Sequence, residues 1–88
     1  MHSTKQVYYN QVKGEISEIN NTKDFPSVVL SVGHDSKRFV NICFKPQLIK
    51  ALQEKHSVGD NVRISFFVSS RFKHGRWYTM ANALEFSE

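Results

Sequence analysis

The sequence predicts an all-β domain that contains one short helix, and three features lead to this prediction. Five segments alternate apolar and polar residues with the period of two that is typical of half-buried strands. One segment, residues 46–55, repeats its apolar residues at helical spacing instead. Polar and glycine-containing turns separate these segments along a chain of 88 residues, a length that allows one hydrophobic core. We therefore expect residues 1–88 to form a single domain.

The first expected strand is long and runs from Gln6 to Ile19. Gly14 interrupts it, and a glycine within a strand pattern often marks a bulge or a sharp bend. The polar cluster 20–24 predicts the turn that follows. The apolar positions of this strand are Tyr8, Val12, Ile16 and Ile19.

The second and third expected strands, 27–32 and 38–44, alternate cleanly and are joined by a turn at 33–36. In the third strand Phe39 falls on the side opposite to the apolar positions. The residues that share the core side of the two strands are Val28, Leu30, Val32, Val40, Ile42 and Phe44.

The helix is expected to begin at Pro46, whose fixed φ suits a first helical turn, and to end before Val58-Gly59-Asp60. A fourth strand follows at 61–69 and a fifth at 77–86, with a turn at 73–75. The residues expected to face the core from the helix and the fourth strand are Leu48, Ile49, Leu52, Val62, Ile64, Phe66 and Val68.

Five strands with one helix between the third and the fourth form the layout of the OB-fold, a small barrel. The long, bent first strand agrees with this layout, because that strand must serve both halves of the barrel. A small open sheet with the helix packed on one face is the alternative arrangement.

The composition narrows the classes of function. Twelve Lys and Arg against eight Asp and Glu give a net charge of +4, which favours a polyanionic partner. The single cysteine, Cys43, excludes an intrachain disulfide and a cysteine-based zinc site, and we expect it to be a half-buried strand residue. No stretch has the length of a membrane span and the N-terminus lacks the apolar core of a signal peptide, so we expect a cytoplasmic protein without membrane contact.

The hairpin from Ser69 to Met80 carries the densest functional signal, because cations alternate there with aromatic residues around Gly75. Cations can contact phosphates and aromatic rings can stack on unpaired bases, which is what binding of a single nucleic-acid strand requires. Ordinary solubilising charges on an exposed turn are the alternative interpretation.

The run from Val58 to Asn82 resembles the distinctive half of a small bacterial OB-fold family of unknown function, whose members are similar to single-stranded-DNA-binding proteins. The resemblance rests on a helix, a Val-Gly-Asp step, a strand, a Ser-Arg-aromatic segment, a Gly-Arg-Trp turn and a final strand. Here these are residues 48–52, 58–60, 64–66, 70–72, 75–77 and 78–83.

This chain departs from that resemblance in two respects. Lys73 and His74 stand near the turn, where the family commonly has an acidic or amide residue, so the loop is more basic. The chain stops at Glu88, whereas bacterial single-strand-binding proteins usually carry a long tail with an acidic tip. We therefore expect an accessory role in replication or repair, or one in a phage or plasmid.

OB-folds hold oligonucleotides across the second and third strands, between the loop that joins strands one and two and the loop that joins strands four and five. The first of these loops supplies Lys23 and Phe25, and the second is the hairpin. The candidate nucleic-acid-binding residues are Lys23, Lys37, Arg38, Phe39, Arg63, Phe67, Arg71, Phe72, Lys73, Arg76, Trp77 and Tyr78.

The aromatic candidates differ in what the pattern predicts for them. Phe39 and Phe67 fall opposite the core side, so they could stack on bases or lie in a dimer interface. Trp77 and Tyr78 are neighbours that point opposite ways in a strand, so we expect one in the core and one on the surface, with Trp77 as the buried residue. Phe72, at the loop, is the better stacking candidate.

Catalysis has little support, and we expect no cofactor. The histidines His2, His34, His56 and His74 lack ligand spacing, and no nucleophile motif or glycine-rich phosphate loop occurs. We expect a non-catalytic OB-fold that binds single-stranded DNA, or RNA, with low sequence specificity and forms a homodimer or a higher oligomer. The alternative is a protein-interaction module whose outward aromatic residues form an oligomer or partner interface.

Overall fold

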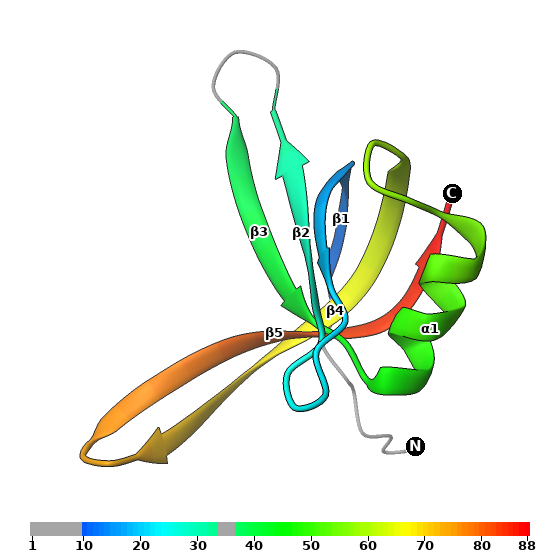
Figure 1. Ribbon diagram of the computed structural model, residues 1–88. Coiled ribbons are helices and arrows are strands. Elements are labelled where there is room, and N and C mark those ends of the chain that lie inside the picture. The colour runs from blue at the N-terminus through cyan, green and yellow to red at the C-terminus, as the bar shows by residue number, and fades with distance from the viewer. Residues whose placement is uncertain (1–9, 34–36) are drawn as a thin grey trace, which may run out of the picture.

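The computed structural model describes residues 10–33 and 37–88, and the chain there follows the predicted order of elements. The five strands close into a barrel in the order β1-β2-β3-β5-β4, which confirms the OB-fold (Figure 1). The elements are β1 (Asn10–Asn20), β2 (Ser27–Val32), β3 (Arg38–Cys43), α1 (Pro46–Lys55), β4 (Asn61–Lys73) and β5 (Arg76–Ser87).

One hydrophobic core fills the barrel, and α1 contributes to it. Ile49 and Leu52 of the helix are fully buried, whereas Leu48 is only partly buried. Pro46 stands in the first helical turn, as expected, and the Leu48 and Ile49 N–H groups both donate to the Lys45 carbonyl at 3.0 Å. The core as a whole comprises Ile16, Val28, Leu30, Ile42, Phe44, Ile49, Leu52, Val62, Ile64 and Ala83.

Gly14 lies at a close approach of β1 to β2, at a position where β1 pairs with β4. A Cβ atom at this position would stand 2.7 Å from the Ser31 carbonyl oxygen and 2.8 Å from Cγ1 of Val32, so only glycine fits without a shift. The bulge that Gly14 was expected to mark lies a little further on, between Ile16 and Glu18. Gly14 therefore permits a close approach of two strands, and the residues after it provide the bulge.

The step between α1 and β4 continues the pairing of β1 with β4. The Ile16 N–H donates to the Asp60 carbonyl and the Gly59 N–H donates to the Ile16 carbonyl, both at 2.8 Å. Gly59 adopts a φ of 103°, which favours glycine. Val58-Gly59-Asp60 follows the end of the helix as predicted.

β4 and β5 are longer than expected and form a hairpin arm (residues 68–81) that extends away from the barrel, towards the lower left in Figure 1. Their pairing continues to Lys73 opposite Arg76, so the turn consists of His74 and Gly75 alone. Both residues have positive φ, 53° and 79°, as a tight two-residue hairpin turn requires.

Two residues expected in the core lie on this arm instead. Val68 is 54% exposed and Trp77 is 69% exposed, so both predictions of burial are wrong. Trp77 and Tyr78 do point to opposite sides, but neither reaches the core, because both belong to the part of the hairpin beyond the barrel. Phe66, which was expected in the core, is partly buried against it.

Parts of two expected elements lie outside the described residues. These are the beginning of the first strand, with Tyr8, and most of the turn at 33–36. The described part of the first strand keeps Ile16 in the core and Val12 and Ile19 partly buried against it.

Candidate nucleic-acid interface

The outward side of the sheet extends from β3 across β5 to β4, and β3 joins β5 at a single residue pair. β3 and β5 meet as parallel neighbours at Cys43 and Asn82, and Asn82 lies opposite Phe67 of β4. Residues side by side on adjacent strands point to the same side of a sheet, and alternate residues along a strand do so as well. The surface so defined, here called the outer face, carries Phe39, Asn41, Cys43, Phe67, Ser69, Arg71, Lys73, Arg76, Tyr78, Met80 and Asn82.

The register of the arm separates its cations from two of its aromatic residues. Arg71 lies opposite Tyr78 and Lys73 lies opposite Arg76, which places all four on the outer face. Phe72 lies opposite Trp77 on the other side, with ring centroids 5.3 Å apart and an edge-on angle of 65° between the planes. The hairpin that reads as one mixed cluster in the sequence therefore has a cationic side and an aromatic side.

The loop between β1 and β2 approaches the outer face of the arm through Phe25, which is 78% exposed. An open groove of about 580 Å³ lies between this ring and the arm. The groove combines an aromatic wall with cationic and thioether side chains. Its lining residues are Phe25, Arg71, Lys73, His74, Tyr78, Thr79 and Met80.

Hydrogen bonds hold the loop that presents Phe25. The Phe25 N–H donates to Thr22 Oγ1 at 3.2 Å, and Asn21 Nδ2 donates to Gln53 Oε1 of α1 at 2.8 Å. The Phe44 N–H donates to the carbonyl of Pro26 at 2.9 Å. The exposed ring therefore extends from an anchored loop, which lowers the entropy lost when it contacts a ligand.

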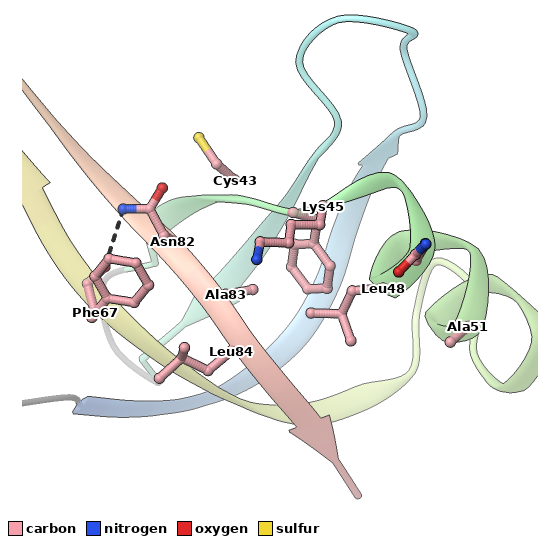
Figure 2. Close-up of a pocket in the computed structure, with 10 residues that line it drawn as sticks. Cys43, Lys45, Leu48, Ala51, Phe67, Asn82, Ala83 and Leu84 are labelled. Carbon is pink, nitrogen blue, oxygen red and sulfur yellow. Dashed lines mark hydrogen bonds between the residues drawn. The ribbon is translucent and has the colours of Figure 1, made fainter. Parts of the chain in front are cut away.

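Asn82 fixes the base of the arm on the outer face. Its Nδ2 donates to Ser69 Oγ at 2.9 Å and approaches the carbonyl oxygens of Met80 and Phe67 at 3.3 and 3.4 Å. Figure 2 shows the bond to Phe67. Asn82 is also the residue at which β5 pairs with β3, so the amide bonds to the arm start from the residue at which the barrel closes.

Phe67 lies on the outer face as expected but is half-buried. It lines a second groove, of about 470 Å³, with residues of α1 and of the strand ends near it (Figure 2). Lys45 supplies the only charged side chain among the residues that line this groove. The full lining is Cys43, Phe44, Lys45, Gln47, Leu48, Ala51, Phe67, Asn82, Ala83 and Leu84.

The β3 candidates lie near the beginning of that strand. Phe39 is 63% exposed on the outer face, next to Ser31 of β2. Arg38 is exposed but alternates to the other side, and Lys37 is exposed directly before the strand. Lys23 is exposed in the loop that carries Phe25.

Arg63 is not brought to these residues. It lies opposite Lys13 of β1 and Ser87 of β5, at the far end of β4. Arg71 follows eight positions later along the strand, a distance of about 26 Å at the usual rise per residue.

Met80, Thr79 and His74 line the groove but were not among the candidate residues. The period of two could have found Met80, because it falls on the same side as Tyr78 two residues earlier. His74 could not be placed in the same way, since a turn residue with positive φ has no fixed side in the alternation.

Within residues 10–33 and 37–88, no group of three or more His, Cys, Asp and Glu side chains is arranged to hold a metal ion. The one helix of this part of the chain, α1, is too short and too polar to cross a membrane. Cys43 is partly buried in its strand, as expected.

No protein-family model matches this sequence, and no curated protein matches it at a significant level. Solved structures do match it along almost its whole length, and several of them are described as single-stranded-DNA-binding proteins. The barrel of this chain is similar to that of the mitochondrial single-stranded-DNA-binding protein Rim1 of Saccharomyces cerevisiae, with a TM-score of 0.70, 11% identity and coverage of 93% of this chain and 95% of that one.

Two bacterial structures are also similar. The N-terminal domain of PriB from Thermoanaerobacter tencongensis, described as dimeric, has a TM-score of 0.63 at 17% identity and covers 90% of this chain and 92% of its own. A small single-stranded-DNA-binding protein from Streptomyces coelicolor has a TM-score of 0.53 at 16% identity, with 94% of each chain covered. At these identities the similarity shows a shared fold.

Proposed function

We propose that this protein binds single-stranded DNA without catalysing a reaction, and that it does so on the outer face. The observation that carries the proposal is the register of β3, β5 and β4. It orients Arg71, Lys73, Arg76 and Tyr78 to the same side of the sheet as Phe39, across the single pairing of β3 with β5. The groove beside Phe25 runs along the arm, next to Arg71, Lys73 and Tyr78.

The proposed mechanism has an electrostatic part and a stacking part. Arg71, Lys73 and Arg76 neutralise phosphates and release the counterions that surround them. Phe39 and Tyr78 offer ring faces on which bases stack, each contributing about 1–3 kcal/mol.

Phe25 is a third stacking residue in this proposal. Lys23 and Lys37 add positive charge around the surface, whereas Arg38 points to the other side of β3. Because phosphates are alike in every sequence and every base has a π face, binding of this kind has low sequence specificity. Arg63 stays outside the proposed interface because of its distance from the arm. Phe67 contacts DNA only at the margin, since it is half-buried.

Two observations support binding of DNA and of a single strand. The similar structures include proteins described as binding single-stranded DNA, and an open, exposed surface with aromatic rings suits bases that are not stacked on a partner strand. A protein-interaction module is the competing function, and it predicts no affinity for any nucleic acid.

The test is a binding titration of three labelled polymers of equal length by fluorescence anisotropy at low salt: oligo(dT), oligo(U) and a DNA duplex. We expect oligo(dT) to bind most tightly and the duplex most weakly. Tighter binding of oligo(U) would contradict the assignment to DNA, and equal binding of the duplex would contradict base stacking. Absence of binding to all three would favour the protein-interaction module.

A further inference from the structure

The side of the arm opposite to the outer face, here called the inner face, carries no charged residue. Its members are Val68, Ser70, Phe72, Trp77, Thr79 and Ala81. Three of these are large and exposed, Val68 by 54%, Phe72 by 61% and Trp77 by 69%. The cations of the arm all lie on the other side. One ribbon of two strands therefore combines a cationic surface with an uncharged, largely apolar one.

Contacts within the inner face order it before any partner arrives. The Phe72 and Trp77 rings pack edge-on with their centroids 5.3 Å apart. The hydroxyls of Ser70 and Thr79 satisfy each other in a hydrogen bond of 3.0 Å. Exposed aromatic residues in a fixed arrangement, without charge around them, are typical of protein–protein contacts.

We propose that the inner face is the contact between two copies of this protein bound next to each other on one DNA strand. This inference rests on the proposed function. The chain has a net charge of +4 and the outer face concentrates cations, so two copies repel each other when they meet by that side. When they meet by their inner faces, no charge is buried and both outer faces remain turned outward for DNA. An acidic partner protein would instead be attracted to the outer face.

The size of the inner face explains why DNA is needed for the contact. An aromatic side chain offers about 150–250 Å², so the exposed parts of Phe72, Trp77 and Val68 together present on the order of 400 Å². A stable dimer usually buries about 800 Å² on each partner. Such a contact is weak between free molecules, and it forms when a shared strand raises the local concentration of the second copy.

The test uses Ser70→Lys, which introduces a cation in the middle of the inner face. Its matched control is Asn61→Lys, which adds the same charge at the far end of β4, opposite Glu15. Binding is measured on oligo(dT) of about 10 nucleotides, close to the footprint of one OB-fold, and on oligo(dT) of about 60 nucleotides. The ratio of the apparent affinity per site on the long strand to that on the short strand reports the contact between copies.

We expect this ratio to be at least about tenfold for the unchanged protein and for Asn61→Lys, and close to one for Ser70→Lys. Affinity for the short strand should be equal or slightly higher in Ser70→Lys, because the added charge is positive. An unchanged ratio in Ser70→Lys would overturn the proposal. So would a loss of short-strand affinity in Trp77→Ala, because Trp77 would then contact DNA itself.

A measurement without DNA separates the failure of this proposal from the failure of the proposed function. Sedimentation equilibrium at high protein concentration should show weak self-association that Ser70→Lys abolishes and Asn61→Lys retains. If the protein bound no DNA but self-associated in this way, the inner face would still be a contact between copies and the proposed function would fail. A protein that remained monomeric and bound both strand lengths with equal affinity would contradict the inner-face contact alone.

Discussion

At the scale of single residues, Gly14 is the position at which β1 approaches β2 closely while it pairs with β4. We expect Gly14→Ala to lower the free energy of unfolding by about 1–3 kcal/mol, the usual cost of an overpacked site. The new methyl group would meet the Ser31 carbonyl, which belongs to the β1–β2 pairing and cannot move aside as a flexible side chain could. Urea denaturation measures the change.

Glu15→Ala, at the next, exposed position of β1, is the control for Gly14→Ala and should change stability by less than about 0.5 kcal/mol. A stable Gly14→Ala variant would contradict the close approach of β1 and β2. The sequence predicted a bulge or bend at Gly14. It could not show that a side chain there would clash with β2, because the contact between the two strands depends on how the chain folds after the turn.

Two substitutions of Tyr78 distinguish stacking of its ring on a DNA base from hydrogen bonding by its hydroxyl. We expect Tyr78→Ala to weaken binding of single-stranded DNA by about 1–3 kcal/mol, and Tyr78→Phe to bind almost as tightly as the unchanged protein, because stacking uses the ring. Fluorescence anisotropy with oligo(dT) measures both. Equal losses in the two variants would instead assign the contribution of Tyr78 to its hydroxyl.

At the scale of elements, the hairpin arm is the part of the molecule that sequence patterns describe least well. Alternation along β4 correctly separates the side of Val62 and Ile64 from the side of Arg71. It cannot tell that the core ends before Val68, because a strand keeps its period of two after it leaves the barrel. The same limitation explains the wrong prediction of a buried Trp77.

The base of the arm depends on Asn82, and this leads to a prediction about dynamics. Asn82→Ala removes the amide that reaches Ser69, Met80 and Phe67, so we expect faster hydrogen exchange of backbone amides in residues 69–80. Amides of core residues such as Ile64 should exchange as slowly as before. Unchanged exchange in the arm would show that pairing of β4 with β5 alone maintains it.

At the scale of the whole molecule, five alternating segments and one helix were enough to predict the barrel and the order of its elements. The sequence also placed most of the candidate residues in the correct strands and loops. It could not show that β3 and β5 meet at Cys43 and Asn82, a contact between residues far apart in the chain. That contact joins Phe39 to the cations of the arm in one outer face, and it leaves Phe72 and Trp77 on the other side.

The most direct test of the central claim, that single-stranded DNA binds on the outer face, is the salt dependence of oligo(dT) binding in two matched variants. Arg71→Ala with Lys73→Ala removes two cations from the outer face, and Arg63→Ala removes one that lies far from the arm. We expect the double variant to bind more weakly and to reduce the slope of log K against log salt by about 1.4, since each phosphate contact contributes about 0.7 on a single strand. Arg63→Ala should keep the original slope. The same slope in all three proteins, or a reduction in Arg63→Ala alone, would contradict the proposed interface.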